Sequence, residues 1–340
     1  MNAAATAHPP RPAAAARQQM RAQVAFVLYL LAAAAGITLP LVGGPLAVDL
    51  MLRTGSVIIL AISWNLAANA GLISLGHSTF WGLGSYTALL IANRLGLPFV
   101  TSLIPAAAIG ALVGSGLAVI TGRLRGIYFA VATLALSEGL RVVSVMLPDL
   151  TGGSAGLYID QALRPAPRLV AVATTMCAVM TALVAHLLSR TPFHYACRAM
   201  RNNEHASQML GVNPLRFRIA VLALSGGIAS LAGGINIWYT GFLDPDIGFD
   251  LHITILAQIG PILGGIHSLA GPIIGGMATI VISELSRIWL GEQGYSLLVY
   301  GVILVVSIMF MPHGIYGSLR RLAARRPRRP VPVRAREVAS

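Results

Sequence analysis

The stretch Pro192–Val212 reads PFHYACRAMRNNEHASQMLGV and carries two arginines, a glutamate, two histidines and two asparagines. Apolar runs flank it over residues 169–189 and 218–240. A membrane helix needs about 20 predominantly apolar residues, so each of these runs is long enough to span a bilayer. The alternation indicates a chain that crosses a membrane and leaves a polar, helix-prone segment outside the lipid.

The composition of the whole chain agrees with this interpretation. Of its 340 residues, 56% are hydrophobic and 10% are charged, and the mean hydropathy is +0.75. Soluble proteins carry roughly 25% charged residues, so the composition is typical of a polytopic membrane protein. No stretch is long and polar enough for a nucleotide-binding domain, and the phosphate-loop pattern G-x-x-x-x-G-K-[ST] is absent from the sequence. If transport is driven by a nucleotide, the motor is expected on another chain.

Apolar runs along the chain predict the fold class. We expect an all-α, polytopic membrane helix bundle of about 8–10 transmembrane helices. The third, eighth and ninth candidates are rich in Gly and Pro, which is typical of broken or re-entrant helices. Ten candidate spans cover residues 22–42, 46–68, 71–92, 99–121, 126–147, 169–189, 218–240, 252–270, 272–290 and 295–312.

The positions of the charged residues predict the orientation. The net charge is +13, and all 24 basic residues are arginines. With the N-terminus inside, the inside loops contain Arg123, Arg125 and the arginines of residues 190–218, whereas Asp244, Asp246 and Asp250 lie outside. Cytoplasmic loops are enriched in arginine and lysine, so we expect an even number of spans with both termini in the cytoplasm.

The two ends of the chain differ in composition from its apolar body. Residues 1–21 are rich in Ala, Pro and Arg and are predicted to form a disordered cytoplasmic lead. Residues 22–318 are expected to form the membrane domain, with its polar loop at 190–217. Eight arginines follow residue 319, so residues 319–340 are interpreted as a basic cytoplasmic tail beside anionic lipid rather than as a nucleic-acid site.

Polar residues inside apolar spans are costly and mark either function or pairing. Five of them are candidates for lining a path for a polar solute, and each has the alternative role of an interhelical hydrogen bond. They are Asn65, Asn69, His77, Asn236 and Gln258.

Two acid–base pairs also fall inside predicted spans. Glu138 and Arg141 are three residues apart, as are Glu284 and Arg287, so each pair lies on one helix face. The favoured interpretation is a self-neutralising pair facing the bundle. The alternative is a bridge to another span or to a second chain that breaks during transport. Carboxylates, histidines, serines and cysteines show no nucleophile–base or metal-ligand spacing, so we expect neither an enzyme nor a metal site.

The polar stretch itself is predicted to be an amphipathic helix over residues 196–211. Ala199, Met200, Ala206, Met209 and Leu210 form an apolar face at roughly helical spacing. Gly211, followed by Asn213 and Pro214, is typical of a helix end. A short charged helix of this kind either docks into a groove of a partner protein or lies among lipid headgroups.

Several motifs resemble one family of permeases. RAMRNNEHASQMLGV (198–212) is similar to the coupling-helix segment of branched-chain amino acid ABC importer permeases, with Ser207 and Gln208 where alanine and glutamate are common. WNLAANAGLISLGHSTFWGLGSYTALL (64–90), LRGIYFAVATLALSEGLRVV (124–143), TGGSAGL (151–157), LGGIHSLAGPIIGG (263–276) and MPHGIYG (311–317) resemble further stretches of the same family, in order. The resemblance runs from about residue 55 to residue 318 and is to the LivM-type subunit.

This resemblance implies a function and a set of partners. The chain would be the transmembrane subunit of an importer for branched-chain amino acids in the bacterial inner membrane. It would bind no cofactor itself and would work with two ATPase subunits that carry ATP and Mg, a second, LivH-type permease and a periplasmic solute-binding protein. The residues that match the family's ATPase-coupling pattern are Arg198, Arg201, Asn203, Glu204, Ala206, Leu210 and Gly211.

Two other functions stay open from the sequence. A urea or amide importer of the same permease family would have the same spans. A gradient-driven secondary transporter would use an intramembrane acid such as Glu138 or Glu284 to carry protons, but each acid has an arginine three residues away. That alternative also leaves the polar stretch without a role.

Overall fold

The computed structural model describes residues 12–266, 268–290, 298, 301, 302, 305, 309 and 314–318, with side chains from Val27 onward. The α-helices in chain order are α1 Pro12–Val42, α2 Pro45–Asn69, α3 His77–Leu95, α4 Phe99–Ile120, α5 Ile127–Met146, α6 Pro148–Thr151, α7 Pro167–Leu188, α8 Pro192–Asn202, α9 Glu204–Met209, α10 Pro214–Thr240, α11 Pro245–Gly248, α12 Leu251–Gly264 and α13 Ala270–Leu290. Two 3-10 turns cover Gly153–Ala155 and Gln161–Leu163. Strands β1 (Leu157–Tyr158) and β2 (Phe242–Leu243) pair antiparallel.

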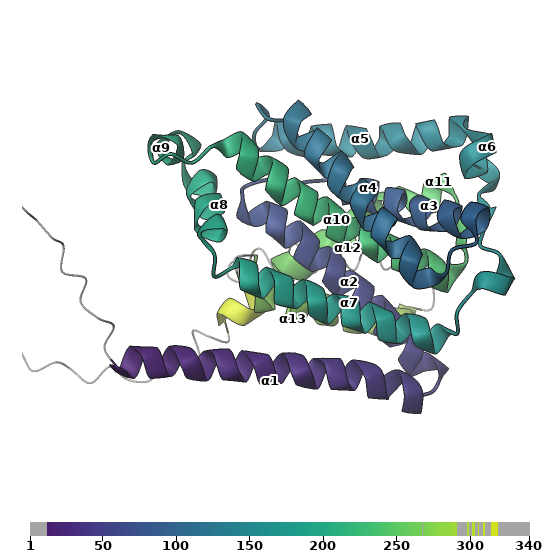
Figure 1. Cartoon of the computed structure of the whole chain (residues 1–340), viewed down its shortest axis with the longest axis horizontal. Coiled ribbons are helices and arrows are strands. Elements are labelled where there is room, and N and C mark those ends of the chain that lie inside the picture. The colour runs from purple at the N-terminus through teal and green to yellow at the C-terminus, as the bar shows by residue number, and fades with distance from the viewer. Residues whose placement is uncertain are drawn as a thin grey trace, which may run out of the picture.

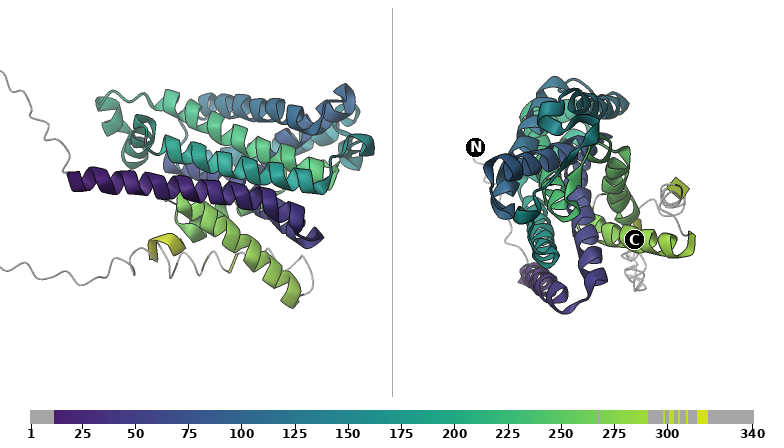
Figure 2. Two further views of the ribbon diagram at one scale, coloured as in Figure 1. Left: turned by 60° about the horizontal axis from the view of Figure 1, so that its bottom comes forward. Right: turned by 90° about the vertical axis from the view of Figure 1, so that its right-hand side faces the viewer.

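The long helices run side by side in one bundle (Figure 1). Helix α10 packs against α4, α3 and α2 and holds the centre, whereas α1 lies at one edge against α7 and α2. Helices α8 and α9 project at one end of the bundle and α6 lies at the other. Figure 2 shows α13 inclined to the remaining helices, and α13 packs on α12 and α2. The expected all-α membrane helix bundle is confirmed.

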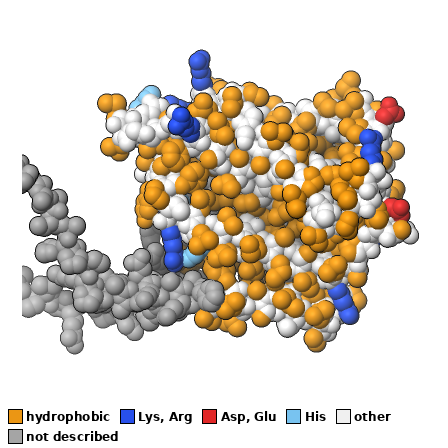
Figure 3. All heavy atoms as spheres, in the orientation of Figure 1, with side chains coloured by type: hydrophobic (Ala, Val, Ile, Leu, Met, Phe, Trp, Pro, Cys, Tyr) orange, Lys and Arg blue, Asp and Glu red, His pale blue; other side chains and the backbone are white. Residues whose placement is uncertain are grey.

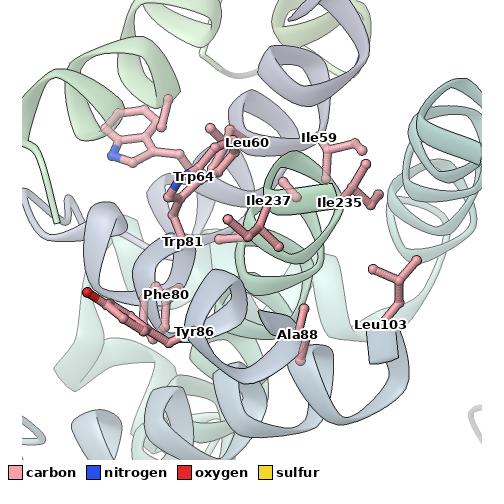
Figure 4. Close-up of a cluster of buried hydrophobic side chains, with 14 of the residues drawn as sticks. Ile59, Leu60, Trp64, Phe80, Trp81, Tyr86, Ala88, Leu103, Ile235 and Ile237 are labelled. Carbon is pink, nitrogen blue, oxygen red and sulfur yellow. The ribbon is translucent and has the colours of Figure 1, made fainter. Parts of the chain in front are cut away.

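Large aromatic side chains fill the centre of the bundle. Trp64 of α2, Phe80 of α3 and Trp238 of α10 are each at most 2% exposed. Figure 4 shows Trp64 and Phe80 with Ile235 and Ile237 where α2, α3 and α10 meet. Small residues allow the helix backbones to approach: a Cβ added at Gly114 of α4 would lie 2.2 Å from the carbonyl oxygen of Leu222 on α10. Close approach through glycine is typical of helix pairs in membranes.

Six helices are long and apolar enough to cross a membrane. They are Pro45–Asn69, Phe99–Ile120, Ile127–Met146, Pro167–Leu188, Pro214–Thr240 and the combined run Pro245–Gly264. Helices α1, α3 and α13 overlap three further predicted spans. The chain is therefore a multi-pass membrane protein. The tenth candidate span, 295–312, lies almost entirely outside the described residues.

Two predicted spans are wrong at their boundaries. The span expected over 71–92 becomes helical only at His77, because α2 ends at Asn69 and Gly71 takes φ +81°. The amides of Gly71 and Leu72 donate to the carbonyls of Ala68 and Ala67, which is the hydrogen-bond pattern of a glycine-terminated helix. The span expected over 252–270 ends at Gly264, since Gly265 takes φ +119° before α13 begins.

The prediction of a disordered lead to residue 21 is wrong for residues 12–21. Helix α1 begins at Pro12, where a proline is tolerated in the first turn, and continues through the alanine run at 13–16. Residues 1–11 and the basic tail 319–340 lie outside the described residues.

Candidate functional site: the polar segment and its clasp

The polar stretch forms two helices rather than the single helix expected over 196–211. Helix α8 ends at Asn202, and Asn203 is extended, with φ −158° and ψ 106°. The Oδ1 atom of Asn203 accepts a hydrogen bond from the amide of Ala206 at 3.1 Å, so Asn203 is the N-cap of α9. Asparagine competes for backbone hydrogen bonds and favours caps over helix interiors, and this is why the helix breaks here.

The end of α9 is fixed by Gly211. This residue has φ +84°, and the amides of Gly211 and Val212 donate to the carbonyls of Gln208 and Ser207. A left-handed glycine with these two bonds closes a helix and reverses the chain. Asn213 then caps α10 through the amide of Arg216 at 3.3 Å. We call residues 192–211 the α8–α9 segment.

One carboxylate ties the α8–α9 segment to the bundle. Glu204 Oε2 lies 3.1 Å from Arg125 Nε and 3.1 Å from an Arg218 guanidinium nitrogen. Arg218 also donates to the carbonyls of Thr121 and Leu124. The side chains of Glu204 and Arg218 are only 14% and 6% exposed, whereas that of Arg125 is 54% exposed. We call Glu204, Arg125 and Arg218 the clasp, which joins α9 to the start of α10 and to the turn before α5.

Apolar contacts hold the inner face of α8. Cys197 and Met200 are buried, and the rings of Phe193 and Phe217 stack at 5.5 Å between α8 and α10. Arg201 is half-buried, and a Cβ added at Gly71 would lie 3.3 Å from its Cγ. Burial, with Arg198 beside it, lowers the pKa of Arg201.

The outer face of the segment is exposed and partly apolar. Met209 and Leu210 are 89% and 81% exposed, the largest such values on this segment for hydrophobic side chains. Arg198, Asn203 and Ala206 are also exposed. Of the seven residues predicted to couple to an ATPase, the structure therefore places Arg198, Ala206, Leu210 and Gly211 outward and directs Glu204 inward. Figure 3 shows hydrophobic side chains over most of the visible face and charged side chains mainly toward its ends.

A hollow of about 350 Å³ lies between the segment and the bundle. Arg125, Arg201, Glu204 and Arg218 line it together with the backbone around Gly71 and Gly126. The clasp therefore bridges this hollow, beside the apolar contacts that hold the inner face of α8.

His77, one of the predicted path residues, lies in the interior. Its side chain is 0% exposed, and its Nε2 atom is 3.3 Å from Ser63 Oγ and 3.2 Å from Ser225 Oγ. Ser63 donates to the carbonyl of Ser225 at 2.7 Å, and Ser225 donates to the carbonyl of Ser63 at 2.9 Å. These bonds link α2, α3 and α10. His77 therefore has the role of an interhelical hydrogen bond, which was the alternative to lining a solute path.

The other four path residues do not form one group. Trp64 of α2 donates a hydrogen bond to the carbonyl of Ser74 at 2.9 Å, and Gln258 donates to the same carbonyl at 3.4 Å. Gln258 therefore lies close to the end of α2 that carries Asn65 and Asn69. Asn65 donates to Ser268 and Asn69 donates back to Asn65. Asn236 is half-buried on α10, about 16 Å along the helix from Ser225. The structure brings Asn65, Asn69 and Gln258 near one another and separates Asn236 from them.

Both predicted ion pairs form, but the first is not in the interior of the chain. Arg141 Nε lies 2.9 Å from Glu138 on α5, and the two side chains are 36% and 49% exposed. Arg141 also reaches Asp246 of α11 at 2.8 Å, so it bridges two elements. Arg287 contacts Glu284 on α13, where the side chains are 45% and 22% exposed. The pair does not face the interior of this chain, as the favoured interpretation expected, because both side chains are partly exposed and Arg141 extends outward to Asp246.

Sequence reasoning missed the partners that complete these contacts. Arg125, Arg218 and Asp246 entered it only as charges that set the orientation. The Asp-Pro-Asp run beside a predicted span could have marked Asp246 as a candidate. Its pairing with Arg141 could not be predicted, because the two residues are 105 positions apart in the chain. Among the described residues, no group of three His, Cys, Asp or Glu side chains is arranged to hold a metal ion.

With this geometry in place, comparisons with known proteins assign the family. Residues 46–308 match the family model described as "Branched-chain amino acid transport system / permease component". The chain belongs to this family. The match covers the helices from α2 to α13 and includes the α8–α9 segment, the clasp and both ion pairs.

Individual relatives of the permease carry consistent names. It is 27% identical over 305 residues to the high-affinity branched-chain amino acid transport system permease protein LivM of Salmonella typhimurium, covering 81% of this chain and 71% of the relative. The LivM protein of Escherichia coli is 27% identical over 304 residues, covering 80% and 70%. A probable LivH permease protein of Methanocaldococcus jannaschii is 27% identical over 263 residues, covering 71% and 82%. These relatives are named as transport permeases and not as enzymes. No solved structure matches the chain.

Proposed function

We propose that this permease carries branched-chain or similar hydrophobic amino acids across the bacterial inner membrane and is driven by two ATPase subunits that bind the α8–α9 segment. A second, LivH-type permease and a periplasmic solute-binding protein complete the assembly. ATP and Mg²⁺ belong to the ATPase subunits. The solute class follows the names of the relatives, and a urea or amide importer is the alternative within the same family.

The observation that carries the ATPase contact is the combination of an inward clasp and an outward apolar tip. Glu204 holds the segment to the bundle, while Met209 and Leu210 protrude at 89% and 81% exposure. A short amphipathic helix with protruding anchors suits a hydrophobic groove on a partner. Arg198 adds an exposed cation in the middle of α8.

The clasp also connects the α8–α9 segment mechanically to two membrane helices. Arg125 lies two residues before the start of α5, and Arg218 lies in the first turns of α10, the helix at the centre of the bundle. A displacement of α9 is therefore transmitted to two membrane helices through one carboxylate. ATP shifts the transporter between states only if the docked segment makes different contacts in each, so a rigid connection is required.

The orientation follows from the same assignment. If the α8–α9 segment meets an ATPase, that end of the bundle is cytoplasmic, and the end that carries α6 and α11 faces the solute-binding protein. Arginine-rich loops then lie on the cytoplasmic side. Both termini are expected there, with the tail 319–340 beside anionic headgroups.

The substitution Leu210→Asp tests this function. It places a charge at the exposed tip without touching the clasp. We expect the ATPase subunit to co-purify at least about tenfold less well, because a buried anchor at an interface contributes about 2 kcal/mol or more. Uptake of labelled leucine should fall in parallel. The measurement is quantitative mass spectrometry of the detergent-solubilised complex beside a cell uptake assay.

Leu95→Asp is the matched control. Leu95 is 66% exposed at the end of α3, so the chemical change is the same at a different place. This variant should retain its ATPase. If Leu210→Asp also retains the ATPase and normal uptake, the exposed tip of the α8–α9 segment is not the docking site.

A further inference from the structure

Helix α5 has one buried face and one exposed face. Its buried residues are Phe129, Ala130, Thr133, Ser137 and Ser144. The opposite side, which we call the α5 face, carries exposed apolar side chains over its whole length. These are Ile127, Tyr128, Val131, Val142, Val145 and Met146, at 36–73% exposure.

One charged side chain, Glu138, lies in the middle of the α5 face, with Arg141 at the edge of this face and Asp246 on the neighbouring α11. Glu138, Arg141 and Asp246 form a cluster with contacts of 2.9 and 2.8 Å, and Asp246 is 80% exposed. Glu138 is 11 residues from the start of α5, or about 16 Å into a helix of about 30 Å. Glu138 is therefore at membrane depth and on the surface of the single chain, and Arg141 connects it to Asp246 of α11, which lies toward the outer end of the bundle.

Contact with lipid is unfavourable for this surface. A charged side chain near the bilayer centre costs at least about 2.5 kcal/mol, and such residues almost always face protein or a water-filled cavity. Contact with bulk water is unfavourable for the same face, because the six apolar side chains around the cluster gain free energy when they are removed from water. A mixed surface of this kind suits a neighbouring membrane protein.

The charge of the cluster indicates the chemistry of that neighbour. Two carboxylates share one guanidinium, so one negative charge stays uncompensated. A twofold contact between two copies of this chain that brought the clusters together would oppose like charges, which is unfavourable across an interface. A different chain with a cation or a hydrogen-bond donor at this depth is complementary.

Helix α4 provides the contrast within the same bundle. Its sequence contains no charged residue, and Ile104, Leu112 and Val119 are 58–72% exposed. That surface is suited to lipid. Helix α13 carries the exposed pair Glu284 and Arg287, but these two charges neutralise each other.

We propose that the α5 face binds a second, related permease chain, whose facing helix presents a cationic or hydrogen-bond-donating side chain to Glu138 and Asp246. This inference rests on the proposed function, in which the transporter contains two permeases, and it names the surface that joins them. Because Arg125 of the clasp lies two residues before the start of α5 at Ile127, the same helix links the ATPase end to the partner permease.

Photo-crosslinking in native membranes tests the contact. Benzoylphenylalanine is placed at Val131 or Val142 on the α5 face and, as controls, at Leu112 or Val119 on α4. After irradiation, adducts are identified by mass spectrometry. We expect the α5 positions to capture a different permease of the same family and the α4 positions to capture no protein.

A charge variant tests the complementarity. Asp246→Asn removes the excess negative charge and should reduce co-purification of the second permease about tenfold, since the coupling of an interfacial charge pair exceeds about 1.4 kcal/mol. Glu284→Gln, which removes a carboxylate from the pair on α13, should leave co-purification unchanged.

The outcomes separate this inference from the proposed function. If the wild-type chain retains its ATPase but the α5 positions capture only lipid, a second copy of this chain or the same proteins as the α4 positions, the α5 proposal is wrong and the function stands. If the wild-type chain retains no ATPase, the proposed function is wrong, and a different permease captured at α5 supports the surface alone.

Discussion

Neutralising Glu204 should loosen the α8–α9 segment without unfolding the bundle. The substitution Glu204→Gln keeps the size of the side chain and one acceptor oxygen but removes the charge that faces Arg125 and Arg218. Arg218 is 6% exposed and would keep its two carbonyl partners without an anion. The segment is then held mainly by the inner face of α8.

The size of the effect follows from the burial of each contact. The contact with Arg125 is half exposed, so it contributes at most about 1 kcal/mol. The contact with Arg218 is buried and charged, and bonds of this kind contribute about 1.5–3 kcal/mol. Because the amide of glutamine replaces part of the interaction, we expect a loss of about 2 kcal/mol. This corresponds to an increase of about thirtyfold in the population of the opened segment.

Hydrogen exchange in nanodiscs measures this population directly. Amides of α8 and α9 should exchange about thirtyfold faster in Glu204→Gln, while amides of α10 beyond its first turns stay protected. The exposed neighbour Gln208 provides a control. Gln208→Ala should change the free energy of opening, as measured by exchange, by less than about 0.5 kcal/mol. In the double variant Glu204→Gln/Arg218→Gln the two losses should not add, because the residues share one contact. Unchanged exchange in Glu204→Gln would refute the clasp as the connection between segment and bundle.

Two further variants test packing and titration. Gly114→Ala should lower the free energy of unfolding by about 1–3 kcal/mol, because its Cβ meets the carbonyl of Leu222, whereas Gly116→Ala, with nothing within 4 Å, should be neutral or slightly stabilising in thermal melts. Burial, and then the neighbouring arginines, lower the pKa of His194. The stability gained from a neutral His194 is therefore complete above about pH 6.5 and is lost as the pH falls toward the lower folded pKa. Exchange of α8 amides, corrected for intrinsic rate, should accelerate on acidification, and His194→Gln should remove this dependence.

The sequence was sufficient for the bundle because hydropathy and length alone specify membrane helices. It was weaker where single residues change the backbone. Gly71 and Gly265 end helices inside apolar runs, and hydropathy does not distinguish a glycine that packs from one that turns. Asn203 interrupts the helix expected over 196–211 for a similar reason. The sequence alone does not distinguish an asparagine inside a polar helix from an asparagine that caps a new helix, because the difference depends on which backbone amide its side chain accepts from.

The candidate path could be predicted only in part. Polar type alone selected His77 and Asn236, but the structure gives His77 two interhelical partners, Ser63 and Ser225, and places Asn236 far along α10 from them. Contacts between distant parts of the chain decide such roles. Ser63 and Ser225, which complete the interior link, are common residues with no local pattern.

Glu204 shows why a family motif and a structural role must be separated. The motif makes this residue a natural choice for an ionic contact with an ATPase, yet its carboxylate is already engaged by Arg125 and Arg218. A charge reversal at Glu204 would therefore weaken coupling whether or not the residue touches a partner, because the contact of α9 with Arg125 and Arg218 would be lost. Leu210 has no such internal role at 81% exposure, so its substitution reports on docking alone. If Leu210→Asp and Glu204→Gln both reduce uptake but only the first releases the ATPase, docking and transmission reside in different residues of the same segment.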